Sequence, residues 1–120
     1  MKFLVMVKSS EKYREQAPPA ALMEAMGKFI QEGFASGRVV DTGGLKPSSS
    51  ATRLRIEKGK LRVTDGPFTE AKEVVGGWAI LKFDSRAEAL ENSRKFMELH
   101  SQHWPEWEGT SEMYEMEDSG

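Results

Sequence analysis

Two short segments that are apolar on both faces constrain the fold of this chain most strongly. In residues 3–7 and 77–83, apolar side chains occupy odd and even positions alike. Because successive side chains of a strand point to opposite faces of a sheet, both sheet faces must be covered at these strands. One layer of helices covers a single face, and the simplest cover for the other is a second copy of the same sheet. The pattern therefore predicts a homodimer with a barrel-like interior.

The order of the other elements narrows the fold class. Apolar residues recur at helical spacing from Ala20 to about Ser36, and a capping box of Ser85 and Glu88 begins a second helix, which is broken at residues 103–107. The expected strands are residues 2–8, 38–42, 52–56, 60–64, 77–83 and 110–116, of which 52–56 and 60–64 form a hairpin. This order predicts an α+β fold, namely a ferredoxin-like antiparallel sheet with two helices on one face and an extra hairpin strand, pairing as a dimeric α/β barrel.

Composition excludes several classes of protein. The length of 120 residues fits one domain, 1–120, which ends in an acidic tail from about residue 117. The chain has no cysteine, which excludes disulfides, thiol catalysis and thiolate metal sites and suits a reducing cytoplasm, where we expect the protein. A net charge of -2 gives no overall attraction to nucleic acid or to an anionic membrane, so neither is expected as a partner.

The predicted hairpin carries a basic face opposite its apolar one. Arg53, Arg55 and Arg62 lie on this face, beside Lys58 and Lys60. Such a face either contacts an anion or RNA, or is an ordinary solvated strand face. We favour the solvated face, because no aromatic residues are interleaved to offer bases a stacking surface.

Residues 64–78 concentrate the side chains that carry chemistry. Asp65 precedes Gly-Pro, where an aspartate either accepts backbone N–H groups and fixes the corner or serves as a pocket acid or base. The following Lys and Glu residues either orient a substrate or solvate a loop, and Gly76-Gly77 allow a close approach to the backbone. The candidate substrate-binding residues of this stretch are Phe68, Glu70, Lys72, Glu73 and Trp78.

His100 is the better placed of the two histidines. The helical periodicity turns it inward near the C-terminal end of its helix, where the helix dipole favours a cation. It either meets Asp65 as a general acid/base pair, or caps and packs against its own helix. His100 and His103 have a spacing that suits one helix face of a metal site, but no third ligand is evident. We therefore expect no metal and no cofactor.

Residues 63–73, together with Gly76-Gly77-Trp78 and Ala87-Glu88-Ala89, resemble the DGPF-domain branch of the YCII-related family. The resemblance runs over nearly the whole chain and implies the dimeric α/β barrel fold, an intracellular bacterial protein, and a pocket like that of small-molecule enzymes such as muconolactone isomerase. It also implies an accessory role beside sigma factors of the extracytoplasmic-function type.

Only some of the functional residues of the family have a counterpart in this sequence. A His–Asp pair is proposed for the YCII branch, and Asp65 fits its acidic position. No histidine occurs in the first expected strand or in the loop that follows it. The closing strand reads Glu-Met-Tyr-Glu at residues 112–115, where many DGPF proteins have Glu-Val-Arg.

Two classes of function fit these observations. The first is a cofactor-free acid/base enzyme of the isomerase or lyase type, which acts on a small polar metabolite with Asp65 and His100 as catalytic residues. The alternative is a non-catalytic ligand-binding protein or a regulatory protein associated with a sigma factor, in which Asp65 is structural. A purely structural role is a third reading.

Overall fold

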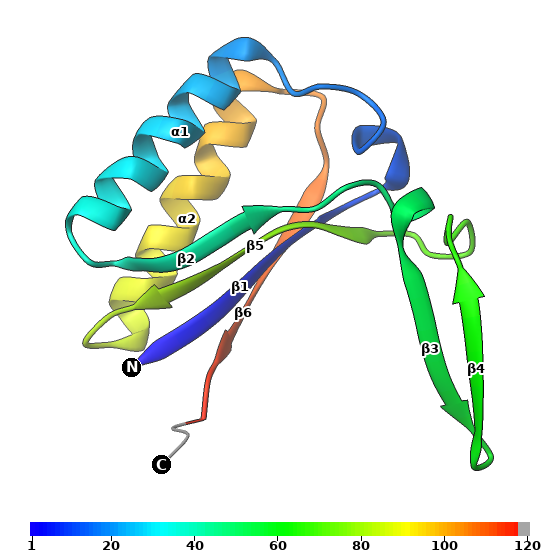
Figure 1. Cartoon of the computed structure of the whole chain (residues 1–120). Helices are drawn as coiled ribbons and strands as arrows, with labels where there is room; N and C mark the ends of the chain where they lie inside the picture. The colour runs from blue at the N-terminus through cyan, green and yellow to red at the C-terminus, as the bar shows by residue number, and fades with distance from the viewer. Residues whose placement is uncertain (118–120) are drawn as a thin grey trace.

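The computed structural model describes residues 1–117 and has the predicted α+β architecture (Figure 1). Its elements are β1 (Lys2–Ser9), the short 3-10 helix η1 (Glu11–Tyr13), α1 (Ala20–Ala35), β2 (Val39–Gly44), the 3-10 helix η2 (Ser48–Ser50), β3 (Thr52–Glu57), β4 (Lys60–Asp65), β5 (Val74–Lys82), α2 (Arg86–His103) and β6 (Gly109–Glu115). The ferredoxin-like arrangement of two helices on an antiparallel sheet is confirmed. Apart from Glu117, the predicted acidic tail lies outside the described residues.

Four strands form the main sheet in the order β2-β5-β1-β6, and all neighbouring strands are antiparallel. Phe3 lies opposite Leu81 and Val5 opposite Ala79, so these side chains share one face of the sheet. Phe3, Val5 and Leu81 are buried there with Val39 and Ala89 in the hydrophobic core. The alternate residues, such as Leu4 opposite Ile80, point to the other face.

Both helices cover the face that carries Phe3 and Val5 (Figure 1). Leu22 of α1 is fully buried, with 0% of its surface exposed. Near the C-terminal end of α1, a Cβ added at Gly33 would lie 2.4 Å from Val39 Cγ2, so the glycine lets the helix approach β2 closely. The helix stops before Gly37, whose φ of 78° is the left-handed conformation that ends many helices.

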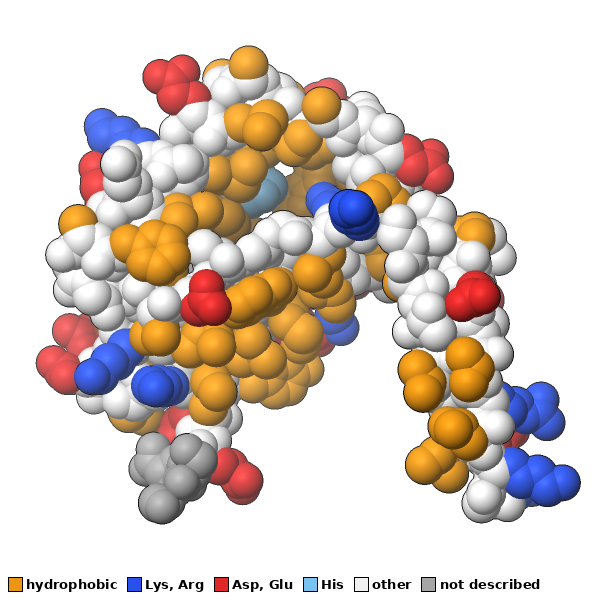
Figure 2. Space-filling model, viewed as in Figure 1, with side chains coloured by type: hydrophobic (Ala, Val, Ile, Leu, Met, Phe, Trp, Pro, Cys, Tyr) orange, Lys and Arg blue, Asp and Glu red, His pale blue; other side chains and the backbone are white. Residues whose placement is uncertain are grey.

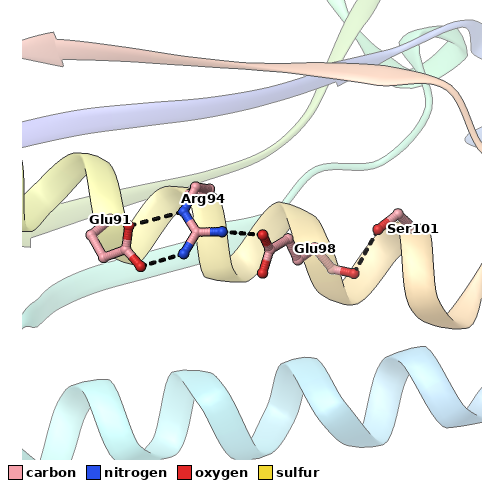
Figure 3. Close-up of polar contacts among 4 residues, drawn as sticks. All are labelled: Glu91, Arg94, Glu98 and Ser101. Carbon is pink, nitrogen blue, oxygen red and sulfur yellow. Dashed lines mark hydrogen bonds and ion pairs between the residues drawn. The ribbon is translucent and has the colours of Figure 1, made fainter.

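Ser85 is confirmed as the N-cap of α2, because its Oγ accepts a hydrogen bond from the Glu88 backbone N–H at 3.2 Å. On the exposed side of this helix, Arg94 pairs with Glu91 and Glu98, and Ser101 Oγ donates to the Glu98 carbonyl at 2.9 Å (Figure 3). The polar residues are therefore turned to solvent, and the opposite side of α2 is buried. That buried side comprises Ala89, Asn92, Ser93 and His100.

The predicted hairpin forms, but it is not an extra strand of the main sheet. Strands β3 and β4 make a separate two-stranded sheet that projects from the body, and we call residues 52–65 the arm (Figure 1). The chain leaves the main sheet after Gly44 and turns at η2, where the Ser48 N–H donates to Glu11 Oε1 at 2.8 Å. On the return, Gly66 packs so closely on η2 that an added Cβ would lie 1.7 Å from the Ser48 carbonyl oxygen. This corner directs the arm away from the sheet.

The face of the main sheet opposite the helices is covered by no described element, and we call it the open face. Leu4, Met6, Trp78 and Ile80 are half-buried on it, and Tyr114 is 51% exposed. Figure 2 shows hydrophobic side chains gathered below the strands and along the side of the arm that is turned toward the body.

Neither described helix has the length and apolar character that crossing a membrane requires.

Candidate ligand-binding site

A cavity of about 360 Å³ lies between the two helices and the helix-covered face of the sheet. Figure 2 shows it as a hollow with hydrophobic side chains around it and a histidine inside. Its volume is in the range of sites for small organic molecules. The cavity is lined mainly by apolar and aromatic residues, and its polar members are Ser9, Tyr13, Arg14, Thr42, Asn92, Ser93, His100 and Ser111.

One end of the cavity is an aromatic wall built where η1 meets the end of α2. The Tyr13 ring meets the Trp104 ring edge-on with centroids 5.6 Å apart, and the His100 ring lies 4.6 Å from that of Trp107. Tyr13 Oη donates to the Glu106 carbonyl at 2.9 Å, which holds η1 against the segment that follows α2. Trp104 is buried. The aromatic wall therefore closes this end of the cavity with flat, rigid surfaces.

His100 lies in this wall and is buried. Its Nδ1 is 3.2 Å from the Phe96 carbonyl oxygen, which can only accept, so Nδ1 carries the proton and Nε2 has a free lone pair in the neutral ring. Burial lowers the pKa of His100, because it disfavours the charged imidazolium, and the bond to Phe96 offsets this only in part. At neutral pH the site therefore holds an uncharged base. No group among residues 1–117 is hydrogen-bonded to Nε2.

Arg14 supplies positive charge to the lining of the cavity. It donates to the Leu45 carbonyl at the end of β2, while its Nε is buried and has no hydrogen-bond partner in the described part of the chain. Its side chain lies flat on Gly76, where an added Cβ would be 3.0 Å from Arg14 Cδ, Nε and Cζ. No aspartate or glutamate is among the described residues that line the cavity. The site therefore favours neutral or anionic molecules over cations.

Asp65 lies outside this cavity, at the base of the arm. It is exposed, and its Oδ1 accepts a hydrogen bond from Thr52 Oγ1 at 3.1 Å across the first pair of the hairpin. Next to it, the Gly66 N–H donates to the Ala51 carbonyl at 2.8 Å. Within residues 1–117 the Asp65 carboxylate thus accepts from a side-chain hydroxyl, and no backbone N–H donates to it as the corner-fixing interpretation proposed. The described chain does not bring Asp65 into the cavity that His100 lines.

Phe68 and Glu70 also lie at the base of the arm, and both contact Arg53. The Arg53 guanidinium lies 4.0 Å from the centre of the Phe68 ring, and the Phe68 N–H donates to Ser48 Oγ at 3.1 Å. Glu70 pairs with Arg53, and this hydrogen bond holds the pKa of the Glu70 carboxyl below its usual value. These two residues anchor the arm and do not line the cavity.

The other three candidate residues are divided between two places. Lys72 and Glu73 border a separate shallow hollow, and Glu73 Oε2 accepts from Thr110 Oγ1 at 2.9 Å. Trp78 of β5 is among the residues around the main cavity, although its pairing with Met6 places its side chain on the open face. Its indole lies beside Gly43, where an added Cβ would be 3.0 Å from Trp78 Nε1. Among residues 1–117, no three His, Asp or Glu side chains cluster in a way that could hold a metal ion.

Tyr13 and Arg14 were not predicted as site residues from the sequence. They belong to a polar connection before Pro18-Pro19, and nothing in that composition indicates that η1 folds back over the sheet. The glycine pair Gly76-Gly77 did predict that another group lies close to the backbone at this point. The group that approaches Gly76 is the Arg14 side chain.

The profile of the YCII-related domain matches residues 1–100, which include the cavity-lining parts of β1, η1, α1, β5 and most of α2. No curated protein matches the chain.

Proposed function

The chain belongs to the YCII-related family, and we propose that it binds a small, largely apolar molecule in the cavity beneath its helices, with His100 as the proton acceptor. The observation that carries this proposal is a buried, uncharged His100 in an aromatic-walled cavity. A flat apolar ligand would stack on the wall formed by Tyr13, Trp104 and Trp107. A hydroxyl or an acidic C–H of the ligand would face the free lone pair of His100 Nε2.

The charge in the cavity favours a ligand that is neutral or carries one anionic group. Arg14 is the charged residue among the described lining residues, and its Nε has no partner within residues 1–117. A ligand carboxylate or enolate would therefore gain a charge-assisted hydrogen bond, which is stronger than a neutral one. A ligand ammonium group would find no carboxylate to pair with. We therefore propose an aromatic or alicyclic acid, phenol or enol as the ligand class.

The reaction that suits this site is an isomerisation without a cofactor. A single base that removes a proton from one carbon or oxygen of the ligand becomes an imidazolium, and it returns to the neutral form when it delivers the proton to another position. Burial lowers the pKa of His100, which supports the second half of this cycle because the buried imidazolium gives up its proton more readily. In the non-catalytic alternative, the same cavity holds the ligand and Nε2 only accepts a hydrogen bond.

Binding can be tested with three probes of the same shape and different charge. Tryptophan fluorescence of Trp104 and Trp107 would be followed with benzoate, benzyl alcohol and benzylamine. We expect benzoate and benzyl alcohol to bind more tightly than benzylamine. Arg14→Gln should weaken benzoate binding roughly tenfold, the value of one charge-assisted hydrogen bond, and leave benzyl alcohol unchanged. Equal binding of all three probes, or of none, contradicts the proposed ligand class.

Proton transfer can be tested separately with phenylpyruvate, an aromatic acid with an enolisable CH₂ group. Deuterium incorporation from D₂O at that carbon would be measured by NMR with the wild type, His100→Gln and the matched control His103→Gln. Accelerated exchange that is lost only in His100→Gln supports acid/base chemistry at His100. Binding without accelerated exchange leaves the protein as a ligand-binding module.

We also propose that a second copy of the chain covers the open face. The support for this pairing is the row of apolar residues there, with Leu4 opposite both Ile80 and Tyr114. A surface of this kind is typical of a contact with another protein, and self-association is the commonest way to cover it.

A further inference from the structure

Asn92 of α2 is a buried polar residue that lines the cavity, with 9% of its surface exposed. The other buried polar residues of the lining are Ser9, Ser93 and His100. Each of those three makes a side-chain hydrogen bond within the chain. Other side chains of α2 are also bonded, but within residues 1–117 none of these bonds reaches the Asn92 amide. The two donors and the acceptor of this amide are therefore free to bind a molecule in the cavity.

The stability of the fold does not explain an asparagine at this position. A buried amide without a partner loses the hydrogen bonds that it makes to water in the unfolded chain. Asparagine is also a weaker helix former than leucine, which has a similar size. Leucine would therefore suit the middle of α2 better than Asn92 does. Residues that reduce stability in this way are typical of binding sites, where a ligand supplies the missing partner.

Asn92 lies at the end of the cavity that is remote from the aromatic wall. One turn before it on α2, Ala89 packs in the core with Leu81. His100, which contacts the wall, lies eight residues further along the helix, a rise of about 12 Å. Between them is Phe96, whose ring lies 5.3 Å from that of His100. The cavity therefore has a polar residue at each end of an apolar, aromatic stretch.

The ligand group that reaches Asn92 should carry no charge. Arg14 lies on Gly76 near the start of β5, five strand residues and roughly 16 Å from Leu81 at the Asn92 end. No aspartate or glutamate is among the described lining residues. A charged group beside Asn92 would be buried without a counter-ion. A hydroxyl, a carbonyl or an amide could pair with Asn92 at no such cost.

We infer that Asn92 determines specificity for the far end of the ligand, which is an elongated aromatic molecule with an acidic group at one end and an uncharged hydroxyl, carbonyl or amide at the other. The acidic end would lie at Arg14, and the rings would lie beside Phe29 and Phe96, whose centroids are 5.8 Å apart. This inference rests on the proposed function. It adds the length of the ligand and its second polar group.

Two rigid probes of suitable length test the inference by isothermal titration calorimetry. Biphenyl-4-carboxylate and 4′-hydroxybiphenyl-4-carboxylate differ only in a hydroxyl at the end remote from the carboxylate. We expect the wild type to bind the hydroxylated probe about fivefold more tightly, the value of one net hydrogen bond. Asn92→Leu should reduce this preference to less than about twofold. Arg14→Gln is the matched control at the other end, and it should weaken both probes alike and keep the preference.

A second measurement on the wild type needs no substitution. Asn92 is the only asparagine of the chain, so protein labelled with ¹⁵N in the asparagine side chain gives a single amide NH₂ group to follow by NMR. The hydroxylated probe should shift these signals more than the parent probe does, because only the hydroxyl can pair with the amide. Signals that respond equally to both probes, or to neither, would overturn the role of Asn92.

Thermal unfolding without ligand separates a binding role from a structural one. Asn92→Leu should raise the Tm by a few degrees, because it replaces an unpaired amide with an apolar side chain of similar size. A lowered Tm would show that Asn92 stabilises the fold and would overturn the inference.

Benzoate distinguishes failure of this inference from failure of the proposed function. If benzoate binds as proposed but the wild type binds the two biphenyl probes equally or not at all, the role of Asn92 is overturned and the proposed function stands. If neither benzoate nor a biphenyl probe binds, both are overturned.

Discussion

The helix-covered face of the main sheet and the apolar face of the arm follow the same strand alternation, but they differ in what covers them. Val5 and Leu81 alternate with residues of the other face and are buried under α1 and α2. Ile56 and Leu61 alternate in the same way and are mostly exposed. Alternation therefore defines a face of a sheet, whereas the burial of that face depends on elements elsewhere in the chain or in another chain.

The largest expected difference between the two regions is the cost of removing a leucine side chain. Leu22→Ala should lower the free energy of unfolding by about 2–5 kcal/mol, because Leu22 is fully buried between α1 and the sheet and its loss leaves a cavity. Leu61→Ala, the same change on the arm, should cost about 0.5 kcal/mol or less. Urea denaturation at a low and fixed protein concentration would measure both. Equal costs for the two substitutions at low concentration would contradict the comparison between a covered and an uncovered apolar face.

Substitutions at two glycines of α1 would measure how closely this helix packs on β2. Gly33→Ala should destabilise the protein by about 1–3 kcal/mol, since its Cβ would lie 2.4 Å from Val39 Cγ2. Gly27 is exposed and has no atom within 4 Å of such a Cβ, so Gly27→Ala should stabilise the protein by about 0.5–1 kcal/mol through helix propensity. Thermal unfolding monitored at 222 nm would compare them.

The two substitutions control each other, because they make the same chemical change in the same helix. A stabilising Gly33→Ala would show that α1 does not pack closely on β2. If both variants were destabilised alike, the cause would be a property of the helix as a whole and not its contact with the sheet.

Much of the fold could be predicted from local patterns. The helical periodicity of α1, the N-cap of α2 at Ser85, and the alternation of β3 and β4 are each specified within a few residues of sequence. The detachment of the arm was not predictable in this way. It depends on contacts between η2, Glu11 and Gly66, which are distant in sequence and meet only in the folded chain.

The candidate site could also be predicted only where local sequence determines the position of a residue. His100 could be placed on the inner side of its helix by periodicity, and the structure adds the bond to the Phe96 carbonyl that fixes which nitrogen carries the proton. Arg14 could not be placed, because its position depends on η1 folding back over β5. Asp65 belongs to a recognisable motif, but a motif gives a residue's neighbours in sequence and not the cavity it faces.

A smaller change is expected in how the free energy of unfolding depends on pH, and it arises from His100 in the covered region. Burial lowers the pKa of His100 below its ordinary value of about 6.5. Between the lowered and the ordinary pKa, the unfolded chain binds more protons than the native chain, so the free energy of unfolding rises with pH. The stabilisation that comes from the neutral, buried His100 is fully present above about pH 6.5, and it is lost as the pH falls through the pKa of His100 in the folded state.

His100→Gln isolates this contribution, because the titration of the aspartates and glutamates is common to the wild type and the variant. The stability difference between wild type and His100→Gln should therefore shrink as the pH falls from about 7.5 to about 5, as measured by urea denaturation at each pH. His103→Gln serves as the control for replacing a histidine in the same helix. A difference that grows on acidification would mean that His100 is stabilised as the cation, and the base proposed for the cavity would be lost.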